Sequence, residues 1–321
     1  MIKIKTLYSV VLINTALILL YLCFCLINTP TFSVYSTQHK PEDRRIHLIF
    51  VGDIMLDRGI LSNIEKYGFD SVFDGAKSFL SNSDFVIANL EGTVTKHDSI
   101  SVKNNKILRF TFKPEYVRRL KDVNINIVSL ANNHSLDFGL LGYKQTKDFL
   151  ASSSIEFFGS ARNDDNIILQ KRIKNKNICF IGYHDLFVQN PEIINAKISA
   201  VRNTCYKIIV FTHWGNEYWN GISNRQRELG RQFIDSGADI VVGSHPHVVE
   251  PFEMYKNGAI FYSLGNFIFD QNLSYYTEHG IALSVIFDDK KTSFKITPTE
   301  IINREVKIST STDVYFISNQ Q

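Results

Sequence analysis

The sequence predicts an α/β fold on the basis of two recurring patterns. Short continuous apolar runs return along the chain, and runs of this length suit strands that are buried on both faces of a sheet. Segments with helical spacing lie between several of these runs, and alternation of strands with helices is typical of α/β proteins. The expected strands are residues 47–51, 85–88, 125–130, 178–181, 208–211, 240–242 and 260–264.

The remaining elements complete a single folded domain. The C-terminal third is poorer in helical patterns, and residues 281–287 and 292–302 are typical of antiparallel strands. The chain shows no internal repeat and no clear boundary between two domains. We therefore expect one domain over residues 46–305, followed by a C-terminal tail, residues 306–321. The expected helices are residues 114–122, 139–151 and 223–236.

The start of the chain predicts a membrane anchor. Residues 7–27 carry no charge and have about the length that a helix needs to cross a bilayer. Lys3 and Lys5 precede them, which favours a cytoplasmic N-terminus. A cleaved signal peptide is the alternative, but its apolar core is usually shorter, and no clear small-residue cleavage site follows here. We expect residues 1–28 to form an uncleaved signal anchor and residues 29–45 a tether, with the folded domain outside the cytoplasm.

Composition argues against a nucleic-acid partner. The chain has 321 residues, of which 44% are hydrophobic and 21% charged, and its formal net charge is +3. This is an ordinary globular composition. Without residues 1–28, which hold two lysines and no acid, the balance is 33 basic to 32 acidic residues. Such a balance does not predict the basic surface that a phosphate backbone requires.

Two cysteines lie beyond the predicted anchor. Cys179 sits in an apolar run, which favours a buried free thiol. A disulfide with Cys205 is the alternative in an oxidising compartment, and the sequence alone does not place the two sulfur atoms.

Polar residues follow six of the expected strands. Open α/β sheets bind ligands at the carboxyl ends of their strands, so these endings predict a functional site. Taken singly, each has a structural explanation; Gly52-Asp53, for example, is typical of a turn or a helix N-cap. The polar residues at these endings include Asp53, Glu91, Asn133, His134, His213, His245, His247 and Asn266.

Three of these residues are histidines that indicate a metal site. His213 follows the strand at 208–211 after Thr212, while His245 and His247 flank Pro246, which restricts the backbone between them. Imidazole is the commonest protein ligand for divalent first-row metals. A structural role remains the alternative for each histidine alone. The neighbouring Trp214, Tyr218 and Trp219 predict either a packed aromatic cluster or a wall of a substrate cleft.

Six sequence motifs include the polar strand endings. They are VGDIML (51–56), ANLEGTVT (88–95), SLANNHSLDFG (129–139), THWGNEY (212–218), GSHPHVVEP (243–251) and YSLGNFIFDQ (262–271). Taken in this order, the motifs resemble the CapA/PgsA family of poly-γ-glutamate capsule biosynthesis proteins. The resemblance covers about residues 46–272, and the N-terminal anchor also suits that family. It implies a fold similar to calcineurin-like metallophosphoesterases, with two packed mixed β-sheets flanked by helices in four layers.

The resemblance also implies a centre with one or two divalent metal ions, such as Mn, Zn or Fe. His134 corresponds to the catalytic histidine of the wider group. Two departures weaken the expectation of a second ion and of phosphoesterase activity. Met55 stands where that group has a histidine, and a thioether is a poor ligand for a hard ion. Glu91 replaces the usual bridging aspartate. The residues that correspond to metal ligands are Asp53, Glu91, Asn133, His213, His245 and His247.

The resemblance implies two competing functions. The first is a metal-dependent hydrolase that trims or releases poly-γ-glutamate at a γ-glutamyl amide, with a phosphate ester as the other possible substrate. His134 would protonate the leaving group or stabilise developing charge. The second is a non-catalytic subunit of a polymer synthesis and export complex, which binds the polyanion and docks onto membrane subunits of the capsule synthase. A cell-surface binding module without metal is the third reading.

Overall fold

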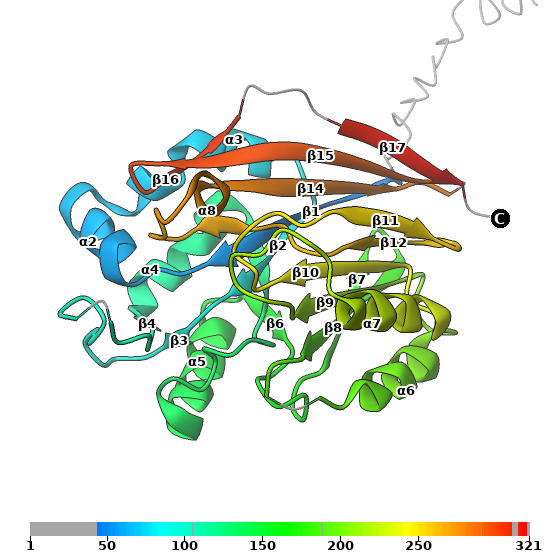
Figure 1. Cartoon of the computed structure of the whole chain (residues 1–321), viewed down its shortest axis with the longest axis horizontal. Coiled ribbons are helices and arrows are strands. Elements are labelled where there is room, and N and C mark those ends of the chain that lie inside the picture. Colours follow the sequence, from blue (N-terminus) through cyan, green and yellow to red (C-terminus); the bar gives the residue numbers. More distant parts are fainter. Residues whose placement is uncertain (1–43, 105, 188, 290, 310–313, 320–321) are drawn as a thin grey trace, which may run out of the picture. The chain divides into compact units, whose positions relative to one another are not determined.

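The computed structural model describes residues 44–104, 106–187, 189–289, 291–309 and 314–319 (Figure 1). The predicted anchor, residues 1–28, lies outside these ranges, and so does the tether up to residue 43. Within the described ranges, no helix is both long enough and apolar enough to cross a membrane.

The first of two facing mixed sheets combines a parallel half with an antiparallel half (Figure 1). The strand order is β16-β15-β14-β1-β2-β5-β6, with β13 beside β1 and β17 beside β15. The parallel half holds β1 (Ile46–Ile54), β2 (Phe85–Leu90), β5 (Ile125–Ser129), β6 (Glu156–Phe158) and β13 (Asn266–Ile268). The antiparallel half holds β14 (His279–Phe287), β15 (Lys291–Ile302), β16 (Glu305–Ile308) and β17 (Val314–Asn319).

The second sheet has the strand order β11-β12-β10-β9-β8-β7. Its four central strands are parallel, and β7 and β11 pair antiparallel at its two edges. The strands are β7 (Ile168–Ile173), β8 (Lys176–His184), β9 (Lys207–His213), β10 (Ile240–Ser244), β11 (Phe252–Tyr255) and β12 (Gly258–Phe261). A separate parallel pair joins β3 (Thr93–Val94) to β4 (Thr111–Phe112).

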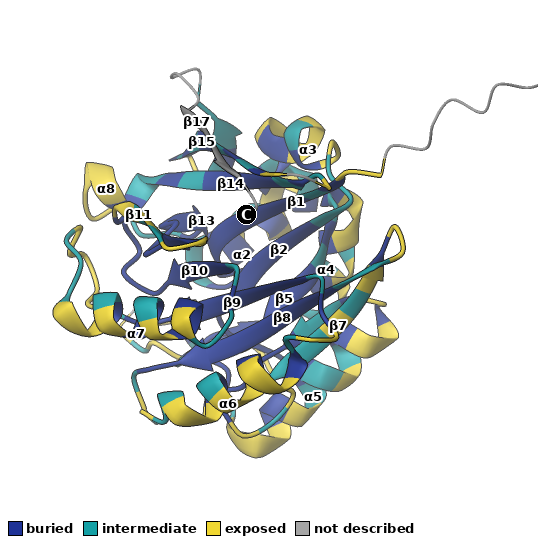
Figure 2. Ribbon diagram, turned by 90° about the vertical axis from the view of Figure 1, so that its right-hand side faces the viewer, coloured by how far each residue is buried: buried dark blue, intermediate teal, exposed yellow. Residues whose placement is uncertain are grey.

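Helices cover the outer face of each sheet (Figures 1 and 2). Along the first sheet lie α2 (Arg58–Tyr67), α3 (Asp74–Leu80), α4 (Pro114–Arg118) and α5 (Gly139–Ser152), with the 3-10 turns η1 (Phe69–Val72) and η2 (Arg119–Val123). Along the second lie α6 (Pro191–Val201) and α7 (Asn224–Asp235). The short helix α8 (Tyr275–Glu278) precedes β14.

The fold has four layers: helices, the first sheet, the second sheet and helices. The alternation of side chains along the strands explains this arrangement. Successive side chains of a strand point to opposite faces of its sheet. On β1, Leu48 and Phe50 pack between the two sheets, whereas Ile49 and Val51 pack against the helices of the first sheet. Buried on both faces, these strands read as continuous apolar runs in the sequence, as expected.

The observed elements agree with the predicted α/β fold of two packed mixed sheets, with differences at the boundaries. The predicted helix 114–122 is the α-helix α4 followed by the 3-10 turn η2. The elements that were not predicted include the helices α2, α3, α6 and α8 and the strands β3, β4, β6, β7, β11 and β13. The strand β7 is half-exposed at a sheet edge, so its sequence lacks a continuous apolar run.

Two further expectations need correction. Residues 306–321, predicted as a tail, contain most of β16 and all of β17, and both strands pair with β15. Backbone hydrogen bonds hold both edge strands. The sequence of β16 has no continuous apolar run, whereas β17 begins with an apolar run, residues 314–317, that sequence analysis missed. The expected free thiol at Cys179 is also wrong, because Cys179 forms a disulfide with Cys205, with Cα atoms 5.9 Å apart.

Candidate metal centre

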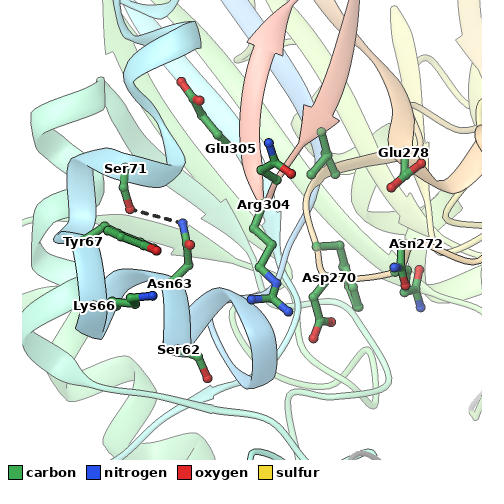
Figure 3. Close-up of a pocket in the computed structure, with 14 residues that line it drawn as sticks. Ser62, Asn63, Lys66, Tyr67, Ser71, Asp270, Asn272, Glu278, Arg304 and Glu305 are labelled. Atoms are coloured by element: carbon green, nitrogen blue, oxygen red, sulfur yellow. Dashed lines mark hydrogen bonds between the residues drawn. The ribbon is translucent and has the colours of Figure 1, made fainter.

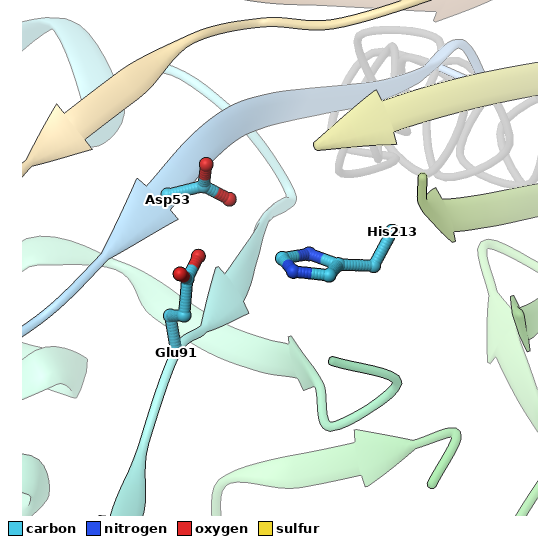
Figure 4. Close-up of side chains that lie close together, drawn as sticks. All are labelled: Asp53, Glu91 and His213. Carbon is cyan, nitrogen blue, oxygen red and sulfur yellow. The ribbon is translucent and has the colours of Figure 1, made fainter. Parts of the chain in front are cut away.

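The carboxyl ends of strands from both sheets meet at one edge of the fold. Asp53 lies on β1, Glu91 follows β2, and His213 ends β9 of the opposite sheet (Figure 4). All three side chains are fully buried. One ligand atom from each lies within 4.8 Å of the other two, which is a spacing that could hold a metal ion.

A glycine allows the close backbone approach at Asp53. The backbone N–H of Asp53 donates to the carbonyl oxygen of Gly265 at 3.1 Å. A Cβ atom on Gly52 would lie 1.8 Å from the same oxygen, so a larger residue does not fit there. Gly52 therefore lets β1 pack against the segment that leads into β13, where Asn266 pairs with Asp53.

Asn89 holds the two carboxylates in place. Its Nδ2 donates to Oδ1 of Asp53 at 2.8 Å and to Oε2 of Glu91 at 3.0 Å. Its Oδ1 accepts from Nδ2 of Asn132 at 2.9 Å. Because Asn89 is itself buried and bonded on both sides, the spacing of the carboxylates is fixed before any ligand binds.

Asn133 and His213 approach each other from opposite sheets. Oδ1 of Asn133 lies 2.8 Å from Nε2 of His213. On the other side of the ring, Nδ1 lies 3.0 Å from Oγ of Ser244, and that hydroxyl lies 2.9 Å from the carbonyl oxygen of Thr212. When Ser244 donates to Thr212, it accepts from Nδ1, and the lone pair of Nε2 then faces the amide oxygen. A cation satisfies two such acceptors.

His245 and His247 both adopt backbone conformations that non-glycine residues rarely use, with φ of 98° and 58°. This turn directs both residues at the carboxylates. The backbone N–H of His245 donates to Oδ2 of Asp53 at 3.3 Å. Nδ1 of His247 lies 3.2 Å from the same oxygen, and its Nε2 lies 3.6 Å from Oε1 of Glu91. Such local strain is often found at functional sites.

Two buried polar atoms of the predicted ligands have no hydrogen-bond partner among the described residues: Oε1 of Glu91 and Nδ1 of His245. Leaving a buried polar atom unpaired costs about 1–3 kcal/mol, so such atoms are rare in folded proteins. Carboxylate oxygen and imidazole nitrogen are suitable ligands for Mn, Zn and Fe. The residues present therefore fit a divalent metal ion.

Burial favours the neutral forms of ionisable side chains in the centre. Burial, reinforced by the nearby Asp53 carboxylate, raises the pKa of Glu91 well above its usual 4.5. Burial also lowers the pKa of His213 well below 6.5, and it lowers the pKa of His245 to about 3. Neutral imidazole is the form that binds metals, and a cation would stabilise the charged form of the carboxylates.

His134 lies beside the predicted ligands at a cleft of about 320 Å³, which His247 and Tyr218 also line. Its Nδ1 lies 2.8 Å from Oδ2 of Asp137, and its Nε2 lies 4.0 Å from Oε1 of Glu91. A carboxylate on Nδ1 orients the ring and leaves Nε2 on the side of the carboxylates. This arrangement is suitable for proton transfer to a bound ligand.

His184 is a histidine of the centre that sequence analysis missed. It ends β8 and pairs in register with His213, with ring centroids 5.7 Å apart. Its Nδ1 lies 2.8 Å from the carbonyl oxygen of Ala161, whereas its buried Nε2 has no partner among the described residues. Burial lowers its pKa to about 4. The signal was available, because His184 follows an apolar run as the other site residues do.

The structure gives the positions of the aromatic residues next to His213 and of Met55, whose roles the sequence left undecided. Trp214 is buried in the core and donates from Nε1 to the carbonyl oxygen of Tyr262 at 2.8 Å, so its role is packing. Tyr218 lines the cleft, and Trp219 is partly exposed. Met55 is buried in the cluster between the first sheet and its helices.

Proteins with similar sequences are named for capsule biosynthesis. A family model described as "Bacterial capsule synthesis protein PGA_cap" matches residues 47–271. A "Capsule biosynthesis protein CapA" of Bacillus anthracis is 32% identical over 302 residues, covering 88% of this chain and 73% of that protein. A "PGA biosynthesis protein CapA" of Bacillus subtilis (strain 168) is 33% identical over 290 residues, covering 85% and 74%.

Solved structures offer a weaker likeness. A phosphatase from Mycoplasma pneumoniae has a TM-score of 0.43 and 13% identity, covering 86% of this chain and 94% of that chain. At this TM-score the likeness carries no argument about function. The family match and the two CapA relatives extend over most of the sequence, and they include the strand endings that build the centre. The chain therefore belongs to the PGA_cap family of bacterial capsule synthesis proteins.

Proposed function

We propose that this chain takes part in poly-γ-glutamate capsule biosynthesis as a metal-dependent hydrolase that trims or releases the polymer. The observation that carries the proposal is the convergence of Asp53, Glu91 and His213 from two sheets, with one ligand atom of each inside 4.8 Å. The capsule role rests on the similarity to two Bacillus proteins named for capsule and PGA biosynthesis. A hydrolase is consistent with the converging ligands and with the capsule role, because the centre lies beside a cleft that a substrate could enter.

The predicted ligands would hold one or two ions: Asp53, Glu91, Asn133, His213, His245 and His247. A divalent ion there would supply Lewis-acid polarisation of a bound carbonyl and neutralise the charge of an anionic polymer. The buried hydrogen bonds of Asn89 keep the two carboxylates at a fixed spacing. Such preorganisation lowers the cost of binding the ion.

His134 would act on the substrate itself. Hydrolysis of a γ-glutamyl amide adds water to the carbonyl and breaks the C–N bond, leaving a carboxylate and an amine. The amine nitrogen must gain a proton as the bond breaks, and Nε2 of His134 lies where it could donate one. Asp137 lies 2.8 Å from the opposite nitrogen of the ring and would hold the ring in this orientation.

The proposed location is the outer side of the cell membrane, with the N-terminal segment as a single-pass anchor. The segment 7–27 carries no charge and follows Lys3 and Lys5. The disulfide between Cys179 and Cys205 supports this location, because disulfides persist in oxidising compartments. Capsule synthase subunits in the same membrane are the expected partners.

The experiment is a hydrolysis assay on the full chain, purified in mild detergent and supplied with Mn, Zn or Fe. Poly-γ-glutamate should shorten, with one free amine formed for each bond cleaved. The Asp53→Asn variant should lose this activity, whereas Lys197→Ala, at an exposed position of α6, should keep it. An intact polymer with cleaved phosphate esters would make the protein a phosphoesterase. If neither is cleaved by metal-loaded protein, the non-catalytic, polyanion-binding subunit is the better account.

A further inference from the structure

A second groove, of about 790 Å³, lies next to the cleft (Figure 3). Its walls come from α2, from the turn between β15 and β16, from the segment after β13 and from α8. Its volume is in the range of ligand-binding pockets. The residues that line it are Ser62, Asn63, Lys66, Tyr67, Ser71, Phe269, Asp270, Gln271, Asn272, Glu278, Ile301, Asn303, Arg304 and Glu305.

The groove holds two cations without a carboxylate partner. Lys66 and Arg304 are exposed and form no ion pair among the described residues. Two of the acids in the groove are already neutralised: Asp270 pairs with Arg58, and Glu305 pairs with Lys307 at 3.2 Å. Two free positive charges therefore line the groove together with one acid, Glu278, that has no ion-pair partner among the described residues.

The fold holds Arg304 in position at some conformational cost. Asn303 and Arg304 form the two-residue turn between β15 and β16, with φ of 52° and 67°. Turns of this kind favour glycine at the second position, so an arginine there is unusual. Gly59 makes room for it, since a Cβ atom at Gly59 would lie 2.8 Å from Nε of Arg304. Figure 3 shows the side chain reaching from the turn towards α2 and Asp270.

The groove adjoins the cleft at the metal centre. Both are lined by the same four residues, Phe269, Asp270, Gln271 and Asn272. His134 and His247 line the cleft but not the groove, so the shared segment separates the metal centre from the groove. A chain that leaves the cleft across this segment would enter the groove.

We propose that this groove binds the continuation of an anionic chain whose reacting segment lies in the cleft. Lys66 and Arg304 bind two of its carboxylates, and the amides of Asn63 and Asn272 contact its backbone. The proposal rests on the proposed function for the identity of the chain. It also predicts that the affinity for the anionic chain increases with the length of that chain until the groove is filled.

The test measures the equilibrium affinity of the full chain for γ-linked glutamate oligomers of increasing length at low salt. Each exposed ion pair contributes modestly, so Lys66→Ala/Arg304→Ala should bind long oligomers about tenfold more weakly, and added salt should reduce this difference. Glu278→Gln should bind them more tightly, because it removes the unpaired acid. The control Lys121→Ala/Lys197→Ala removes the same charge from exposed positions on η2 and α6 and should bind as the wild type does.

A second measurement separates this inference from the proposed hydrolase. The Asp53→Asn variant keeps the groove, so it should retain the gain in affinity with length even though it lacks turnover. If the wild type shows no gain with length, or the groove variant keeps it, the groove is not a binding site. A wild type that binds through the groove but cleaves nothing would overturn the hydrolase and leave this inference standing.

Discussion

The amide of Asn133 and the imidazole of His213 meet between the two sheets, with Oδ1 of Asn133 2.8 Å from Nε2 of His213. Asn133 follows β5 of the first sheet, and His213 ends β9 of the second. The contact shows that the centre is built where the sheets face each other. Its shape therefore depends on the packing of the core between the sheets, as well as on the residues that line it.

The first prediction concerns metal content. Asp53→Asn and His245→Ala should each lower the metal bound by the purified protein, because each removes a ligand or its charge. Asn89→Ala should weaken metal affinity about 10–100-fold, since it releases both carboxylates without removing a ligand. Elemental analysis of protein purified without chelator measures this. Full metal content in both Asp53→Asn and His245→Ala would refute the assigned centre, and circular dichroism checks that the variants fold.

The second prediction concerns proton transfer. His134→Ala should keep its metal but lose turnover by about 10²–10⁴-fold, which is the usual contribution of a general acid. Asp137→Asn should cause a smaller loss, because its carboxylate, 2.8 Å from Nδ1 of His134, holds the ring in place. Turnover rates of the metal-loaded variants test this. Undiminished turnover in His134→Ala would remove this residue from the mechanism.

The third prediction concerns stability and pH. Burial raises the pKa of Glu250 to about 8 from its usual 4.5, and Gln226 donates to Oε2 at 2.7 Å. Below pH 4.5 the group is protonated in both the folded and unfolded states. Between pH 4.5 and 8 the unfolded state ionises first, so the free energy of unfolding falls by about 1.4 kcal/mol per pH unit. Glu250→Gln does not ionise and should lose none of this stability.

Urea unfolding at pH 4.5 and pH 8 measures the difference. The two proteins should be similar at pH 4.5, and Glu250→Gln should be the more stable at pH 8. Glu192→Gln, at an exposed position of α6, serves as the control and should follow the wild type at both values. A difference that does not grow with pH would contradict the burial of an ionisable Glu250.

The fourth prediction concerns the disulfide. Cys179 and Cys205 are 26 positions apart, and closing a loop of this length stabilises a folded protein by about 3 kcal/mol. Cys179→Ala/Cys205→Ala should lose roughly that amount in urea unfolding. Reductant should destabilise the wild type and leave the variant unchanged. The chain also contains Cys23 and Cys25, so four reactive thiols in the unfolded wild type without reductant, instead of two, would show that the bond does not form.

Local sequence was sufficient for much of the fold. Strands buried on both faces require continuous apolar side chains. The apolar runs in the local sequence were therefore enough to predict β1, β2, β5, β8, β9 and β10. Edge strands need only backbone hydrogen bonds on one side. Strand β16 is half-buried, and its sequence has no continuous apolar run. Sequence analysis therefore predicted most of it to be part of a tail.

The amino-acid sequence by itself determined the residue types at the strand ends, and with them the candidate ligands and the family. The tertiary structure decided which of these residues meet. It placed His184 beside His213, joined Cys179 to Cys205, and brought Lys66 and Arg304 into one groove. These contacts join residues far apart in the chain, and no local pattern encodes them. The physical reason is that the packing of the two sheets fixes such distances, whereas a strand ending depends only on its own few residues.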